Sequence, residues 1–199
     1  MAYALAVVIG YLLGSIPFAL LVGRRHGVDL LAVGDRNPGA WNALEQLGPR
    51  RAWPAFAGDG AKGLAAGLAG LALGDVWVAY VAVAASMLGH CFPLFLRFRG
   101  GMAVMTFAGG AFALAPLAAL VALAVCAAVS AARSFALGAR VGVFGFPLVQ
   151  LAFDGPLRVA ATGALMSLIG LRYLARFLSE RRAGRNGRAT SASGAAPRA

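Results

Sequence analysis

The sequence predicts an all-α fold, a polytopic membrane helix bundle with about seven transmembrane helices, short motif loops on the cytoplasmic face and the N-terminus outside. Two observations predict this class. Of the 199 residues, 60% are apolar and 13% are charged, whereas a soluble domain carries roughly 25% charged residues. The arginines lie at the ends of long apolar runs, as they do in membrane proteins. The net charge of +11 therefore indicates membrane insertion, and we expect no nucleic-acid partner.

The apolar runs that define the expected spans are Tyr3 to Val22, 52–73, 76–96, 102–132, 134–153 and 157–178. The run at 102–132 has 31 residues, about 46 Å as one helix at roughly 1.5 Å per residue. That length exceeds the roughly 30 Å of a bilayer core. Because Gly109-Gly110 and Pro116 can turn the chain, we expect two short helices in this run.

The distribution of basic residues favours seven crossings over six. With seven crossings, 17 of the 18 basic residues lie on one side and only Arg158 lies on the other. The alternative is that 102–132 forms one long tilted helix with a kink. We expect one transmembrane domain at 1–178. The basic segment 179–199 lacks periodicity, and we expect it to be a disordered cytoplasmic tail.

Two polar segments with turn-forming residues interrupt the apolar chain. In the first, 34–42, glycines permit a ligand to approach the backbone and Arg36 can neutralise an anion. The alternative is an ordinary solvated loop with Trp41 as an interfacial anchor. In the second, 89–101, His90 precedes a proline break and the pair Gly100-Gly101, whose amides can point towards an anion. The alternative is that His90 is a satisfied polar residue at a helix end, which is the commoner case for a lone histidine in that position.

Lys62 is the single lysine in a chain that has 17 arginines. It lies three residues after Asp59 near the start of the second span, so the two side chains share a helix face. Lys62 is either a site that needs a compact ammonium group or half of a snorkelling ion pair. Cys91 and Cys126 have no paired spacing, and we expect no disulfide, no metal and no cofactor.

Taken together and in this order, these segments resemble the bacterial acyl-phosphate:glycerol-3-phosphate acyltransferase family of integral membrane proteins. The family's Gly-Ser-Ile-Pro-Phe occurs as Gly14–Phe18, and its Gly-Ser-Gly-Asn-Pro-Gly-Ala-Thr-Asn loop corresponds to 34–42. Its Asp-x-x-Lys-Gly occurs as Asp59–Gly63. Its Gly-His-x-Phe-Pro segment, which runs on to Lys-Gly-Gly-Lys-Gly-Val-Ala-Thr, corresponds to 89–106. The resemblance covers about residues 1–178.

The resemblance implies transfer of a fatty acyl group from acyl phosphate to the first hydroxyl of glycerol 3-phosphate. The products are lysophosphatidic acid and inorganic phosphate, in the first step of phospholipid biosynthesis. The implied location is the bacterial inner membrane, with the active face cytoplasmic. The implied partners are the two substrates, membrane lipid and the enzyme that makes acyl phosphate. The acyl group of acyl phosphate is already activated. Orienting it against the hydroxyl, with hydrogen-bond donors for the developing oxyanion, is sufficient for acyl transfer, so no protein nucleophile is required.

The resemblance also implies roles for individual residues. The implied catalytic residues are His90, Lys62 and Asn37. The implied substrate-binding residues are Ser15, Arg36, Gly39, Asn42, Arg99, Gly100, Gly101 and Thr106.

The chain departs from the family pattern within these motifs. Asp35-Arg36 replaces Ser-Gly, Trp41 replaces Thr and Met102 replaces the second lysine. Phe135-Ala136 stands for a serine pair, and Tyr173 and Arg176 stand for a late His and Asn. The alternative function is therefore a catalytically silent relative that binds a phosphorylated lipid or a partner enzyme. A small transporter lacks support because the spans show no repeated halves.

Overall fold

The computed structural model describes residues 1–193 and is helical throughout its regular elements in that range. The elements in chain order are α1 (Ala2–Ser15), α2 (Phe18–Arg25), α3 (Ala40–Leu47), α4 (Pro49–Leu73), α5 (Val76–Cys91), η1 (Leu94–Leu96), α6 (Val104–Leu114), α7 (Pro116–Ala132), α8 (Phe135–Gln150) and α9 (Pro156–Ser193). Within residues 1–193, three segments are long and apolar enough to cross a membrane, namely Ala2–Arg25, Val76–Leu96 and Pro156–Ser179. The all-α class is thereby confirmed, whereas the number of spans and their orientation stay predictions.

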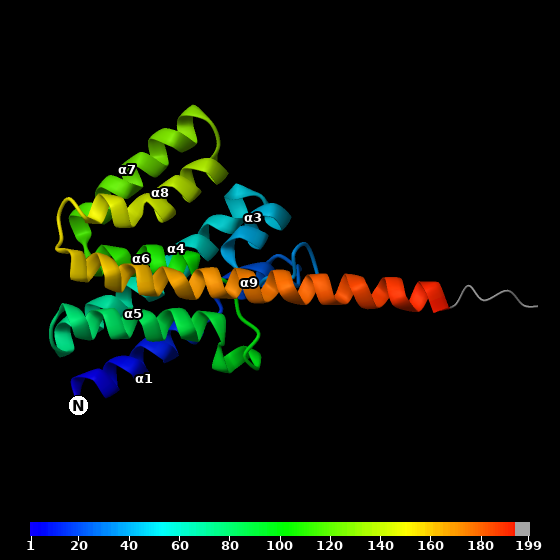
Figure 1. The fold of residues 1–199 in the computed structure, drawn as a ribbon, viewed down its shortest axis with the longest axis horizontal. Helices are drawn as coiled ribbons and strands as arrows, with labels where there is room; N and C mark the ends of the chain where they lie inside the picture. The colour runs from blue at the N-terminus through cyan, green and yellow to red at the C-terminus, as the bar shows by residue number, and fades with distance from the viewer. Residues whose placement is uncertain (194–199) are drawn as a thin grey trace, which may run out of the picture.

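The chain reverses direction at two ends of the bundle. The N-terminus and the turns α4–α5, α6–α7 and α8–α9 lie at one end, and α3 and the loop before α6 lie at the other (Figure 1). At the α4–α5 turn, Asp75 is the N-cap of α5, and its carboxylate accepts hydrogen bonds from the backbone amides of Trp77 and Val78. The motif segments Gly14–Phe18, 34–42 and 89–101 therefore lie at the α3 end of the molecule, and Asp59–Gly63 lies in the middle of α4.

The long run 102–132 divides into α6 and α7, as expected, but the break is at Pro116 alone. Gly109 and Gly110 remain inside α6 and do not turn the chain. A Cβ atom on Gly109 would collide with the carbonyl oxygen of Gly60, so this glycine lets α6 approach α4 closely. The proline breaks the helix because it lacks the amide hydrogen that a continuous helix needs.

The ends of other helices also differ from the expected spans. The first span is interrupted at Pro17 and continues as α2 to Arg25. The polar segment that follows contains a short helix, α3, and the second span begins earlier, at Pro49. The expected disordered tail begins at 179, but α9 continues through it to Ser193. Residues 194–199 of that tail lie outside the described residues.

Small residues bring the central helices together. On α1, a Cβ at Gly10 would collide with the Ala82 carbonyl oxygen of α5, and one at Gly14 would collide with that of Ser86. On α4, a Cβ at Gly63 would collide with the carbonyl oxygen of Thr106. Such close backbone approach is characteristic of helix packing in membranes, where shape rather than water exclusion drives association. It places the buried faces of α4 and α5 directly beside the motif loops.

The helices α7 and α8 form a hairpin that leans away from this central group (Figure 1). A buried polar cluster links the α8 end of the hairpin to the bundle at the end remote from the motif loops. Gln150 Nε2 donates to the hydroxyl of Tyr80 at 3.1 Å, and that hydroxyl lies 3.0 Å from Thr162 Oγ1. Arg158 pairs with Asp154 and donates to the carbonyl oxygen of Leu114. The hairpin is therefore fixed at one end.

Candidate active site

A buried group of charged side chains lies between α4 and α5. Lys62 Nζ is 2.9 Å from Asp59 Oδ1 and donates to the carbonyl oxygen of Ile16 at 2.9 Å. His90 Nδ1 lies 3.6 Å from the same Asp59 oxygen. Lys62 is only 4% exposed, so it does not snorkel to the membrane surface, whereas the expected pairing with Asp59 is present. Among the described residues, its ammonium group makes one hydrogen bond, to Ile16, and one ion pair, with Asp59, and because Lys62 also lines a crevice it has donor capacity for a ligand there.

The ammonium group is held where a proline interrupts the first span. Because a residue that precedes proline avoids the helical conformation, Ile16 is extended, with φ of −66° and ψ of 119°, and α1 ends at Ser15. The carbonyl oxygen of Ile16 then accepts the amide of Phe18 at 3.2 Å and is also open to a side-chain donor. Lys62 reaches that oxygen across 46 residues of sequence. The break that shortens α1 thereby creates an acceptor for the only lysine of the chain.

The loop after η1 returns the chain to His90. The amide of Gly101 donates to the carbonyl oxygen of His90 at 3.0 Å. A Cβ on Gly101 would meet His90 Nε2 and would lie 3.2 Å from Asn37 Oδ1, so only glycine leaves room for these two groups. The expected catalytic residues His90 and Asn37 are thus neighbours across this glycine. Its own amide is engaged within the loop and does not point at a ligand.

A narrow crevice and a wider polar pocket meet at Gly100. The crevice is about 10 Å³, room for one water-sized group, and Lys62 and His90 line it. The polar pocket is about 620 Å³ and opens beside it. The residues that line the polar pocket are Gly34, Asp35, Arg36, Asn37, Gly100, Met102, Arg172, Ala175, Arg176 and Ser179. A small anionic ligand in this pocket faces backbone and guanidinium donors.

Three further predicted residues surround these spaces. Ser15 lines the crevice, and its hydroxyl donates to the carbonyl oxygen of Tyr11 at 2.8 Å. Arg36 lines the polar pocket with φ of 58°, a left-handed conformation that is uncommon outside glycine. Gly39 precedes α3, and a Cβ there would lie 3.2 Å from Asn37 Nδ2. Gly39 therefore leaves space for the Asn37 amide.

Three predicted binding residues are not brought into either space. Asn42 is fully buried, and its Nδ2 donates to the carbonyl oxygens of Leu30, Val33 and Asn37, each at 3.1 Å. It supports the loop from behind, since its amide donors are taken up by the backbone. Thr106 is buried where α6 packs on α4. Arg99 is exposed and does not line the polar pocket.

Two arginines of α9 contact the loops of the polar pocket but were not among the predicted site residues. Arg172 Nη2 donates to the carbonyl oxygen of Gly100 at 3.2 Å, and Arg176 Nη1 lies 3.0 Å from Asp35 Oδ2. The sequence did contain one indication of their shared role. Arg172 and Arg176 are four residues apart, a spacing that places both side chains on one face of a helix. It could not reveal which loop they face.

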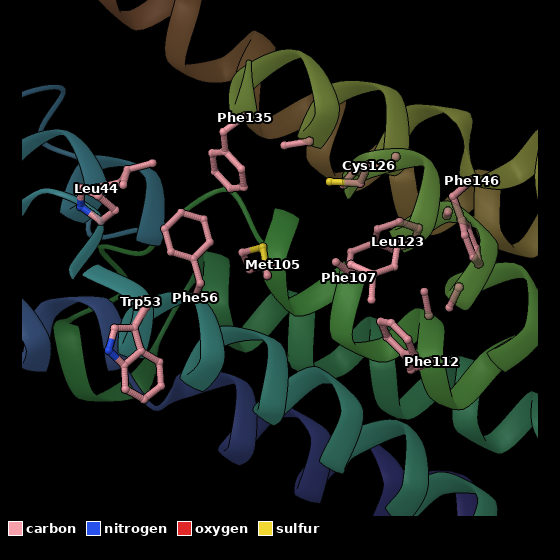
Figure 2. A pocket seen from close by; sticks show the side chains of 18 residues that line it. Leu44, Trp53, Phe56, Met105, Phe107, Phe112, Leu123, Cys126, Phe135 and Phe146 are labelled. Carbon is pink, nitrogen blue, oxygen red and sulfur yellow. The ribbon is translucent and has the colours of Figure 1, made fainter. Parts of the chain in front are cut away.

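A second cavity, almost entirely apolar and about 610 Å³, lies between the α7–α8 hairpin and helices α4 and α6. Figure 2 shows Phe56 and Phe135 at one end, Met105 near the middle and Cys126 and Phe146 towards the other end. Trp41 stacks on Phe135 with the ring centroids 6.0 Å apart. The volume lies within the roughly 300–1,000 Å³ of small-molecule sites. Apolar lining of this kind suits a hydrocarbon chain.

The fold and the site define an integral-membrane protein with an arginine-lined polar pocket and a separate apolar cavity. Residues 4–180 match a family model described as glycerol-3-phosphate acyltransferase. The chain belongs to this glycerol-3-phosphate acyltransferase family.

Curated relatives carry the same description. The glycerol-3-phosphate acyltransferase of Jannaschia sp. (strain CCS1) is 39% identical over 171 residues, which cover 85% of this chain and 84% of the relative. That of Geobacter sulfurreducens is 37% identical and covers 83% of this chain and 87% of the relative. That of Rubrobacter xylanophilus is 46% identical over 117 residues, which cover 58% of this chain and 59% of the relative.

Two solved structures are similar to this one over most of the chain. Both are of PlsY (YgiH), described as an integral membrane glycerol 3-phosphate acyltransferase. Its glycerol 3-phosphate form has a TM-score of 0.77 and 30% identity, and it covers 91% of this chain and 94% of PlsY. Its lysophosphatidic acid form has a TM-score of 0.75 and 29% identity over the same shares.

Proposed function

We propose that this protein is a glycerol-3-phosphate 1-O-acyltransferase that uses acyl phosphate as the donor and releases lysophosphatidic acid and inorganic phosphate. The proposal is supported by the family and by PlsY, whose structures include forms with glycerol 3-phosphate and with lysophosphatidic acid. Its location is the bacterial inner membrane with the polar pocket at the cytoplasmic face, as the arginine distribution favours. A partner consistent with this chemistry is the enzyme that makes acyl phosphate.

The observation that carries the proposal is the position of the two spaces on either side of one short segment. Met102 lines the polar pocket, and Met105 and Phe107, at the start of α6, line the apolar cavity. An acyl phosphate has a dianionic head and a hydrocarbon tail, and we propose that its head occupies the polar pocket while its tail occupies the apolar cavity. Its carbonyl then lies near the junction, beside the loop that carries Gly100 and Gly101.

The reaction balances without a protein nucleophile. The first hydroxyl oxygen of glycerol 3-phosphate forms a bond to the acyl carbon, the bond from that carbon to the phosphate oxygen breaks, and the hydroxyl proton leaves with the phosphate. Lys62 donates to developing negative charge in the crevice. His90 and Asn37, on either side of Gly101, hold the hydroxyl in line with the carbonyl.

The alternative is a catalytically silent relative that binds a phosphorylated lipid or a partner enzyme. One observation favours it. Met102 lines the polar pocket at the position where the family pattern has a lysine, so that pocket lacks one cation. Loss of a charge-assisted bond costs about 1.5–3 kcal/mol, roughly ten- to a hundredfold in rate or affinity.

The test is turnover by the purified full-length protein in lipid nanodiscs, supplied with palmitoyl phosphate and glycerol 3-phosphate. We expect lysophosphatidic acid and inorganic phosphate in equal amounts, with no product when glycerol 3-phosphate is replaced by glycerol. The protein from Jannaschia serves as the positive control. Absence of product from this chain, under conditions where the control turns over, would favour the silent relative.

A further inference from the structure

Two arginines one turn apart on α9 connect this helix to both loops of the polar pocket. Arg172 donates from Nη2 to the carbonyl oxygen of Gly100 at 3.2 Å and from Nε to that of Gly101 at 3.4 Å. Its guanidinium also lies 4.8 Å from the ring centroid of Phe92. Arg176 pairs with the carboxylate of Asp35 at 3.0 Å and donates to the backbone oxygen of the same residue. The middle of α9 therefore holds two loops that are remote in sequence.

Both carboxylate oxygens of Asp35 have partners. Oδ2 pairs with Arg176, and Oδ1 accepts the amide of Asn37 at 3.0 Å. The intervening Arg36 has φ of 58°, a conformation that persists only when neighbouring contacts impose it. A continuous series of bonds thus runs from α9 through Asp35 to the turn that presents the Asn37 side chain beside Gly101.

The ion pair between Asp35 and Arg176 also changes the charge of the polar pocket. An isolated carboxylate in the polar pocket would repel a phosphate. In the structure Arg176 pairs with the Asp35 carboxylate. The carboxylate is therefore neutralised by a residue 141 positions away, and Arg36 and Arg172 remain as cations facing the pocket.

We propose that Asp35 and Arg176 form a positioning pair, through which α9 holds Asn37 in the geometry that acyl transfer needs. Arg176 acts through Asp35 and is not itself a ligand of the substrate phosphate. The inference rests on the proposed function for its kinetic measurement, and a second measurement below is independent of activity.

The kinetic test compares Asp35→Ala, Arg176→Ala and the double variant with the wild type. We expect each single variant to lower kcat/KM for glycerol 3-phosphate about fivefold, mainly through kcat. The double variant should lose about the same fivefold, because either change already releases the turn. The matched control is Arg181→Ala, which removes a cation one further turn along α9 whose guanidinium lies over Phe177.

Two kinetic outcomes would overturn the proposal. A lower KM in Asp35→Ala together with a higher KM in Arg176→Ala would mean that Arg176 binds the phosphate and that Asp35 merely competes for it. A double variant that loses about 25-fold would mean that the two residues act separately.

The second measurement is hydrogen–deuterium exchange of the segment 34–39 in the same nanodiscs. We expect the Asn37 amide to exchange about tenfold faster in Arg176→Ala than in the wild type, and at the wild-type rate in Arg181→Ala, because Asp35 Oδ1 accepts that amide. Unchanged exchange in Arg176→Ala would overturn the pairing. If the wild type shows no turnover but the exchange result holds, the proposed function fails while the positioning pair stands.

Discussion

At the residue scale, Lys62 and Asp59 are charges that the protein holds almost completely away from water, at 4% and 1% exposure. Burial of an ion is costly unless a partner with good geometry compensates it. Here the 2.9 Å pair and the Ile16 carbonyl supply that compensation. The pair therefore serves stability and leaves ammonium donor capacity for chemistry, and these two roles can be separated by mutation.

Lys62→Met leaves the Asp59 carboxylate buried without its cation. We expect a loss of about 3–5 kcal/mol in the free energy of unfolding, together with loss of activity. The double variant Asp59→Leu/Lys62→Met should recover most of the stability, since two apolar side chains need no compensation, but should remain inactive. Unfolding in detergent titrations and turnover in nanodiscs check the two parts. Turnover in the stable double variant would contradict the role of Lys62.

Gly101→Ala tests the narrow space between His90 and Asn37. The added Cβ would displace the His90 ring, and a displacement of about 1 Å at a reacting group can cost about a hundredfold in rate. We expect kcat to fall by about that factor with little change in the unfolding midpoint. The control is Gly163→Ala on α9, where a Cβ meets nothing within 4 Å. Equal activity of the two variants would show that the His90 ring position is unimportant.

At the scale of elements, the α7–α8 hairpin is the feature that creates the apolar cavity. It is fixed at one end through the cluster around Gln150 and by Phe146, which packs edge-on against Phe107 of α6 with ring centroids 5.9 Å apart. Between this end and the other, the apolar cavity separates the hairpin from α4 and α6. The hairpin leans away from the central helices in Figure 1. At the other end Phe135 of α8 contacts Phe56 of α4 edge-on, with centroids 5.8 Å apart. The hairpin and α4 thereby enclose a space between two defined ends.

Ala139 lines this cavity from α8, so Ala139→Phe should shorten it. Each buried methylene contributes about 0.8 kcal/mol, roughly fourfold in affinity. We therefore expect the KM for long-chain acyl phosphates to rise relative to that for short-chain ones. Competition assays with donors of 10 and 16 carbons measure this preference. The control Leu148→Phe changes an exposed position of the same helix, and an identical shift in both variants would exclude the cavity as the chain site.

The polar cluster that fixes the hairpin lies far from the motif loops. Tyr80→Phe removes the hydroxyl that accepts from Gln150 and donates to the carbonyl oxygen of Arg158. Hydrogen bonds inside membrane proteins contribute about 0.6–2 kcal/mol. We expect the unfolding free energy to fall by about 1 kcal/mol while kcat is unchanged. Tyr3→Phe, at an exposed position, is the control, and a loss of kcat in Tyr80→Phe alone would show that the hairpin end is coupled to catalysis.

At the scale of the whole molecule, hydropathy and glycine or proline placement predicted most of the helices. The break at Pro116 and the pairing of Asp59 with Lys62 follow from local rules, because they depend on neighbours along the chain. Local rules misassigned Gly109-Gly110, which serves the close approach of α6 to α4. Whether a glycine turns the chain or permits packing depends on the facing helix.

Long-range pairings account for what the sequence could not predict at the site. From the sequence, Asp35 had only its neighbour Arg36 as a nearby cation, whereas its partner in the structure, Arg176, is 141 residues away. Arg99 appeared suited to phosphate, but the turn after η1 directs it outwards. The amide of Gly101 bonds to His90, which no spacing rule predicts. Each of these depends on which loops the helices α5 and α9 bring together.

The central claim is that one donor molecule spans the polar pocket and the apolar cavity. The most direct measurement is photolabelling of the protein in nanodiscs with an acyl phosphate that carries a diazirine at the end of its chain. We predict labelled peptides from α6–α8, at cavity residues such as Phe112, Cys126 and Phe146, with labelling suppressed by excess unlabelled palmitoyl phosphate. Labelling spread over exposed residues such as Leu148 and Leu171, and unaffected by the competitor, would contradict the account.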